Sequence, residues 1–369
     1  MRMGFHYWLP QVIWSIAIFL TATLGVAEKK PQYTAEGISI PAATVDEPIR
    51  EHFSLEAATD YLEKGAIAWA QERKCVACHT TGAYMQLRPV LTPVLGKPAE
   101  AMREFFVQQL AKSKASSIEK LKSGIHPTQV ATLAHGLAAW DAHVSGSLST
   151  ETRDALSLML KLQSADGSWH NDDCWPPLES SSYHGSTVAA LALATAPGYL
   201  NEATDEQTVR ITRLMDYLKN QPPPHDYGRL LLLWTATRID DLMTDDQKQQ
   251  VIDMLWSHQR DDGGWSIRTF SSPEEWGRGN RADKLRAEPE FEIPPSDGHQ
   301  TGLVIFVLRE AGIPASDERI QKGVKWLKSN QRQSGRWWTR SLNTDSKHFI
   351  TYSGTLYPLL ALQKCDALQ

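Results

Sequence analysis

Two cysteines and a histidine lie close together near the start of the chain, in the segment Cys75-Val76-Ala77-Cys78-His79. Two thiols at this C-x-x-C-H spacing can add to the two vinyl groups of one porphyrin, and the adjacent imidazole then falls on the iron. The sequence therefore predicts a covalently attached c-type haem. Cys75 and Cys78 are its expected attachment residues, and His79 is the expected iron ligand.

The same cysteine pair has other readings, a local disulfide or half of a zinc site. A zinc site would need a second pair of ligands at similar spacing, and the sequence offers none. The residues after the motif, Thr80-Thr81-Gly82, also resemble the start of a cytochrome c. No compact segment of cytochrome length follows them, so the resemblance ends there.

The N-terminus predicts export. Residues 1–27 combine a basic start at Arg2, an apolar stretch from Val12 to Val26, and small residues before a charged segment, which is typical of a cleaved signal peptide. The alternative is an uncleaved membrane anchor over residues 8–26, long enough to span a bilayer. Either reading places the rest of the chain in the periplasm or another extracytoplasmic compartment. Residues 28–53 are expected to form an extended linker.

Composition narrows the possible partners. The 369 residues carry a formal net charge of −5, with no excess of Lys and Arg that would bind phosphates. We therefore expect no nucleic-acid partner. The 13 Trp residues are a more unusual feature.

Much of this tryptophan belongs to an internal repeat of the form Gln-x3-Gly-x-Trp. Each copy follows an amphipathic helical run, and its Gly suits a left-handed helix end over which the Trp folds back. The three copies begin at Gln163, Gln259 and Gln331. After each turn comes a second, more uniformly apolar helix, which is typical of a buried helix.

The repeat predicts an all-α fold of six outer and inner helix pairs, an (α/α)6 toroid over residues 54–369. The inner helices would line the centre and the outer helices would cover them. The haem motif at 75–79 takes the place of the first repeat turn. The expected outer/inner pairs are 54–74/82–95, 98–122/126–143, 151–163/184–195, 207–220/226–238, 246–259/299–311 and 318–331/351–363.

The last repeat has a recognisable form, Lys322-Gly323…Leu327-x3-Gln331-x3-Gly335-x-Trp337. It resembles the QW motif of the squalene–hopene cyclase and protein prenyltransferase superfamily, whose folds are α/α toroids. The resemblance covers residues 150–365 well and the first two repeats weakly. The resemblance implies the toroid architecture and not an activity, because a repeat marks a fold whereas chemistry depends on a particular site.

Cyclases of this superfamily protonate a terpene with an aspartic acid in a DxDDTA-type motif at the start of an inner helix. The nearest counterpart here is Asp297-Gly298-His299-Gln300-Thr301, which has His and Gln where the central acids belong. An imidazolium is too weak an acid to protonate an alkene. The sequence therefore disfavours terpene cyclisation.

Prenyltransferases in the superfamily hold zinc with Asp-x-Cys and a His, and the matching residues here are Asp172, Cys174 and His184. We favour the reading of residues 170–174 as a polar surface loop, and zinc remains an alternative. Cys174 should precede an inner helix and Cys365 should follow one. They would lie roughly 20 Å apart, so we expect no disulfide between them.

Four histidines stand at expected inner-helix starts, on the same rim as the haem turn. His126, His184, His225 and His299, with Asp297, are candidates for a sixth iron ligand or a cavity rim; a capping role is the alternative. The insertion at residues 267–296 is either a cover for the cavity or a solvated loop.

Together these features favour an exported haem protein in which a toroid supports electron transfer or haem-dependent redox chemistry. Its partner would be a redox protein or a small ligand, including a terpenoid or lipid. Two alternatives stay open: a non-redox terpenoid-processing or lipid-binding toroid, and an interaction scaffold.

Overall fold

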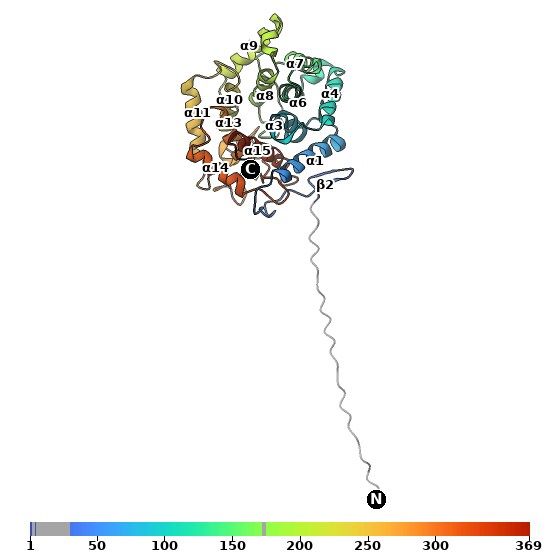
Figure 1. The fold of residues 1–369 in the computed structure, drawn as a ribbon, viewed down its shortest axis with the longest axis vertical. Helices are drawn as coiled ribbons and strands as arrows, with labels where there is room; N and C mark the ends of the chain where they lie inside the picture. Colours follow the sequence, from blue (N-terminus) through green and yellow to red (C-terminus); the bar gives the residue numbers. More distant parts are fainter. Residues whose placement is uncertain (2–3, 5–29, 172–174) are drawn as a thin grey trace.

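The computed structural model describes residues 1, 4, 30–171 and 175–369. Within these residues the only sheet is a two-stranded antiparallel hairpin of β1 (Tyr33–Ala35) and β2 (Ile38–Ile40). Almost all other regular structure is helical, and the main helices form two concentric rings (Figure 1). The predicted all-α toroid is confirmed.

The outer ring of the described chain contains six helices, each amphipathic with one buried face. They are α1 (Leu55–Arg73), α4 (Glu100–Lys114), α7 (Thr150–Lys161), α9 (Asp205–Asn220), α11 (Asp245–Ser257) and α14 (Glu318–Ser329). Most begin at a Ser, Thr or Asp whose side chain accepts a hydrogen bond from the first turn, a typical N-cap.

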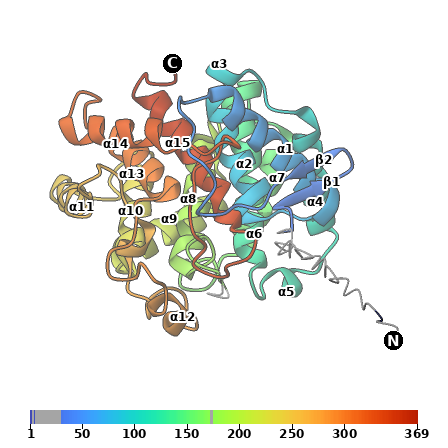
Figure 2. The ribbon, with the colours of Figure 1, turned by 90° about the horizontal axis from the view of Figure 1, so that it is seen from below.

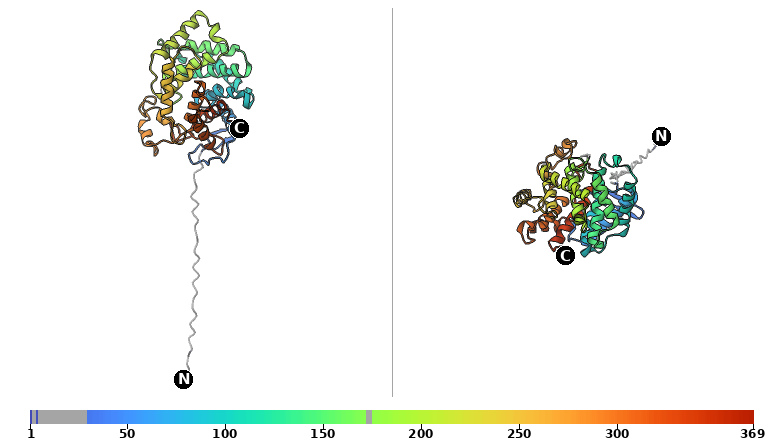
Figure 3. Two further views of the ribbon diagram at one scale, coloured as in Figure 1. Left: turned by 60° about the vertical axis from the view of Figure 1, so that its left-hand side comes forward. Right: turned by 90° about the horizontal axis from the view of Figure 1, so that it is seen from above.

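The inner ring is more apolar and more fully buried. Its helices are α2 (Ala83–Leu87), α6 (His126–Trp140), α8 (Ser182–Thr195), α10 (Asp226–Ala236), α13 (Gly298–Glu310) and α15 (Ser353–Lys364). Each contacts the next around the ring, and α15 contacts α2, so the ring is closed. Figure 2 shows it from the side, and Figure 3 gives two further views of the packed pairs.

The first inner helix differs from the single helix expected over 82–95. A π-helical turn (Cys78–Gly82) leads into α2, which is followed by a 3-10 turn (Arg88–Leu91) and the short α3 (Thr92–Leu95). Pro89 and Pro93 explain the breaks, because proline lacks the N–H that a continuous helix needs. The other short helical segments are α5 (Ile118–Leu121), a π-turn (Asp141–Ser145) and 3-10 turns at Tyr199–Glu202 and Phe349–Thr351.

The Gln-x3-Gly-x-Trp turns are built alike. In each, the buried indole Nε1 donates to a carbonyl in the last turn of the preceding outer helix. The pairs are Trp169 with Met159 at 3.1 Å, Trp265 with Leu255 at 2.7 Å and Trp337 with Leu327 at 2.7 Å. The tryptophan therefore covers the end of its own helix, as predicted.

The glutamines of these turns join neighbouring repeats. Each side-chain Nε2 donates to its own glycine carbonyl and to a carbonyl near the start of the following outer helix. The second acceptors are Arg210 of α9 for Gln163, Arg319 of α14 for Gln259, and Ser54, the N-cap of α1, for Gln331. The last turn thus closes the ring onto the first helix.

The segment expected as an extended linker, 28–53, instead packs on the toroid where the structure describes it. Arg336 is buried, donates to the carbonyls of Pro41 and Ala42, and pairs with Glu47. The segment therefore covers the seam between the last repeat and the first. It supplies the acceptors that the buried guanidinium of Arg336, in the last Gln-x3-Gly-x-Trp turn, requires.

The insertion at 267–296 contains a 3-10 turn (Ile267–Phe270) and the short α12 (Ala282–Arg286). It is anchored by the buried side chains of Phe270, Trp276 and Leu285. The Trp276 ring lies 4.7 Å from the ring of His225 at the start of α10. The insertion therefore packs against inner-helix starts through buried side chains and is not a wholly solvated loop.

No helix in the described part of the chain is long and apolar enough to cross a membrane. The expected signal peptide or anchor falls almost entirely outside the described residues.

Candidate functional site

The C-x-x-C-H turn follows α1 directly. Helix α1 ends at Arg73, and Lys74 takes a left-handed conformation (φ 54°) that turns the chain. Cys75 is exposed, whereas Cys78 and His79 begin the π-helical turn and are half-buried. Gly82 lets this turn approach α6 closely, since a Cβ there would lie 2.5 Å from the Thr132 side chain.

The imidazole of His79 lies between residues from opposite ends of the chain. Its ring stacks on Phe349, with centroids 5.0 Å apart and planes 7° from parallel, and it meets the edge of Trp69 at 4.7 Å. Burial lowers the pKa of His79 to about 4. The ring is therefore neutral at physiological pH, which is the form that binds metals.

One nitrogen of this ring has a fixed partner. His79 Nδ1 lies 2.8 Å from the hydroxyl of Thr80, and that hydroxyl lies 2.9 Å from the Tyr33 hydroxyl. Thr80 and Tyr33 are both buried. With Nδ1 engaged, Nε2 is the nitrogen left for a ligand, and such a second contact typically orients a metal-binding histidine.

Cys78 and His79 share a pocket of about 210 Å³. Its remaining walls are polar at Ser341, Asn343, Thr344 and Ser346, and apolar at Trp175, Pro176, Pro177, Leu178, Phe349 and Ile350. The Cys78 thiol donates to Glu179 at 2.9 Å. A half-open, largely apolar pocket beside a thiol and a neutral imidazole suits the face of a porphyrin.

Cys75 lies on another face of the turn. Its thiol is free in this structure, and it lines a separate pocket of about 120 Å³ with His126. The Nδ1 of His126 contacts the Ser123 carbonyl at 2.7 Å. The structure therefore brings Cys78 and His79 to one pocket, and Cys75 and His126 to its neighbour.

The other candidate histidines are buried at inner-helix starts and do not line the Cys78 pocket. His299 is committed through both nitrogens, to the Tyr227 hydroxyl at 3.1 Å and to Ser353 at 2.9 Å. His225 is the N-cap of α10 and accepts from the Gly228 N–H at 3.1 Å. His225 thus takes the capping role given as the alternative, whereas His299 is held by two hydroxyl groups.

His184 lies within the first turn of α8, and its Nδ1 has no hydrogen-bond partner among the described residues. Burial lowers its pKa to about 4. The other two members of the alternative zinc set, Asp172 and Cys174, lie outside the described residues. In the part of the chain that is described, no group of three or more His, Cys, Asp or Glu side chains could hold a metal ion. Cys365 is a buried free thiol.

Asp297 is the N-cap of α13, and its carboxylate is fully used. It accepts from the backbone N–H of Gln300 at 2.9 Å and of Ile267 at 2.7 Å, and from the Thr339 hydroxyl at 3.3 Å. Burial raises its pKa to about 6. A carboxyl group engaged in this way holds the helix start and the insertion together.

Residues 224–367 match the family model of the squalene-hopene cyclase C-terminal domain. This range runs from the start of α10 through α15 and contains the turns at Gln259 and Gln331. No curated protein gives a match to the chain. The match supports the squalene-cyclase-like toroid that the QW motif implied.

Within this squalene-hopene cyclase-like region, large side chains occupy the interior of the ring. Trp234 of α10 contacts Phe306 of α13 at 5.5 Å and Tyr357 of α15 at 6.4 Å between centroids, and all three are buried. Since α10 and α15 are not neighbours in the ring, this contact crosses it. The aromatic rings thus fill part of the centre.

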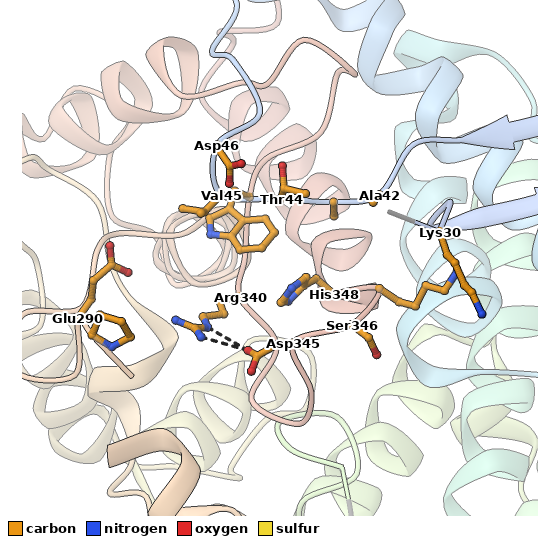
Figure 4. Close-up of a pocket in the computed structure, with 14 residues that line it drawn as sticks. Lys30, Ala42, Thr44, Val45, Asp46, Glu290, Arg340, Asp345, Ser346 and His348 are labelled. Carbon is orange, nitrogen blue, oxygen red and sulfur yellow. Dashed lines mark hydrogen bonds and ion pairs between the residues drawn. The ribbon is translucent and has the colours of Figure 1, made fainter. Parts of the chain in front are cut away.

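A second pocket, of about 600 Å³, adjoins the Cys78 pocket and shares Ser346 with it. Figure 4 shows the pocket: Asp46 and Thr44 come from the N-terminal segment, Glu290 from the insertion, and Arg340, Asp345 and His348 from the loop before α15. Arg340 pairs with Asp345 at 3.1 Å. The guanidinium of Arg340 and the carboxylate of Asp345 therefore neutralise each other within the pocket wall.

Sequence reasoning found Cys75, Cys78 and His79 but missed the residues around them. Thr80 follows the motif directly and gave no separate signal. Phe349 lies 270 residues after His79, and Tyr33 lies 46 residues before it. Only the closed ring brings these residues together.

Proposed function

We propose that this chain is an exported c-type haem protein built on a squalene-cyclase-like toroid. Cys75 and Cys78 would attach the haem, and His79 would ligate its iron through Nε2. The observation that carries the proposal is the His79 ring, which is half-buried and neutral, has Nδ1 held by Thr80, and shares a largely apolar pocket with the Cys78 thiol. When bound, the haem supplies one-electron chemistry.

The residues around the site would do three things. Phe349 and Trp69 fix the plane of the imidazole, Thr80 holds its Nδ1–H, and Trp175 with Pro176 and Pro177 would keep water from one side of the pocket. Cys75 is exposed and directly follows Lys74, whereas the next two residues, Val76 and Ala77, are buried. The Cys75 thiol must rotate away from the His126 pocket to share a porphyrin with Cys78.

The test is covalent haem content. The full chain, exported by a host that attaches haem c, should carry one haem per chain that survives denaturing electrophoresis and gives a haemochrome spectrum. Cys75→Ser and Cys78→Ser should each lose most of it, and His79→Ala should change the iron spectrum. Cys365→Ser, which removes a buried thiol elsewhere, is the matched control. A wild-type chain without covalent haem refutes the proposal.

The family match favours a second candidate, a non-redox toroid that binds a terpenoid or another lipid. The capped carboxylate of Asp297 argues against protonation-driven cyclisation, so this candidate is a binding or processing function. Solvent extraction of the purified full chain, followed by mass spectrometry, tests it. A stoichiometric isoprenoid or fatty lipid without haem would favour this reading over the haem protein.

A further inference from the structure

Tyr33, in strand β1, contacts the three residues that hold the His79 ring, Thr80, Phe349 and Trp69. Its hydroxyl contacts Thr80 Oγ1 at 2.9 Å, and its ring lies 5.4 Å from Phe349 and 6.4 Å from Trp69 between centroids. Thr80, Phe349 and Trp69 are the same three residues that contact His79. The N-terminal hairpin is therefore the second layer around this imidazole.

The residue before Tyr33 holds another part of the site. Gln32 is buried, and its amide donates to the carbonyls of Lys347 at 2.8 Å and His348 at 3.1 Å. Both residues have left-handed backbones, with φ of 65° and 44°. Such a conformation is unfavourable for non-glycine residues and persists when the surroundings impose it. Gln32 thus stabilises the turn that presents Phe349 to His79.

We propose that Thr80 and Tyr33 are positioning residues for His79, so that the N-terminal hairpin regulates the reduction potential of the site. This inference rests on the proposed haem. With Nε2 on iron, Nδ1 carries the ring proton and donates it to Thr80 Oγ1, while the Thr80 hydroxyl donates to the Tyr33 oxygen. Each acceptor in this series of hydrogen bonds makes the His79 imidazole more electron-donating, and a more electron-donating imidazole would stabilise ferric iron.

The proposal is tested by potentiometry on the full haem-loaded chain. Thr80→Val removes the acceptor for Nδ1–H, and Tyr33→Phe removes only the outer hydroxyl. Thr80→Ser keeps the hydroxyl and should rescue the wild-type value. Tyr183→Phe is the matched control, because Tyr183 is also a buried tyrosine but donates to the Leu218 carbonyl, on the α8 and α9 side of the ring.

We expect the midpoint potential to rise in Thr80→Val and to rise less in Tyr33→Phe, with covalent haem retained. Thr80→Ser and Tyr183→Phe should match the wild type. If haem is retained and neither Thr80→Val nor Tyr33→Phe shifts the potential, the inference is wrong and the haem proposal stands. If Thr80→Val does not fold, Tyr33→Phe decides alone.

A second measurement does not need the haem. In the haem-free full chain, nitrogen-15 spectra of the histidines should show the His79 ring with its proton on Nδ1, and Thr80→Val should shift that proton toward Nε2. A wild-type ring protonated on Nε2 would overturn the inference. A wild-type chain that never acquires haem would remove the proposed function, whatever the tautomer.

Discussion

Ring closure depends on one glycine, and its replacement gives the sharpest test of the fold. Gly335, in the last Gln-x3-Gly-x-Trp turn, has φ of 91°, and a Cβ built on it would lie 2.2 Å from the backbone carbonyl of Ala57 in α1. Gly312 has the same φ but nothing within 4 Å of its Cβ position. The two Gly→Ala variants therefore share the backbone strain and differ only in the contact.

The strain of a left-handed alanine is worth about 1 to 2 kcal/mol in both variants. At Gly335, α1 must also move away, which weakens the contacts of Gln331 with Ser54 and adds about 2 to 3 kcal/mol of overpacking. Urea unfolding followed by circular dichroism measures both. We expect Gly335→Ala to lose about 2 to 3 kcal/mol more unfolding free energy than Gly312→Ala. Equal losses would show that the seam does not close as described.

Two further outcomes follow from buried polar groups. Gln331→Ala removes three hydrogen bonds, two of them to Ser54 across the seam, and Gln163→Ala removes two within the ring. At about 1 kcal/mol per bond, Gln331→Ala should therefore cost more unfolding free energy in chemical denaturation; the reverse order would contradict the closing role. Asp297 has a higher pKa folded, about 6, than its usual 3.8, so its contribution is complete below pH 4 and is lost as the pH rises through 6. Between pH 4 and pH 7, the unfolding free energy of the wild type should therefore fall by about 3 kcal/mol relative to that of Asp297→Asn, measured under the same conditions. A constant difference would mean that the Asp297 pKa is not raised.

The helix pairs could be predicted because their signal is local. Apolar residues at helical spacing mark the helices, and a repeated Gln, Gly and Trp marks the ends of three of the outer helices, α7, α11 and α14. Even the ring closure follows from counting six pairs. The first inner helix was predicted as one piece because the apolar pattern continues through Pro89 and Pro93, which break it.

The surroundings of His79 could not be predicted in the same way. Strands β1 and β2 have three residues each, too few for a periodic pattern, so residues 28–53 read as a linker. The partners of Tyr33 and of Arg336 lie in distant parts of the chain. No local spacing encodes such contacts, and the three-dimensional closure alone creates them.

The position of His79 at the seam has a kinetic consequence. Gln331 and Ser54, which join the ring, are separated by 277 residues, and Phe349 belongs to the same late segment. Contacts of such long sequence separation form slowly, because the chain between them must be ordered first. The pocket of Cys78 and His79 therefore takes shape only when the final repeat docks on the first, and a chain truncated before Ser341 would keep the motif but lose the residues from Ser341 to Ile350 that line the pocket.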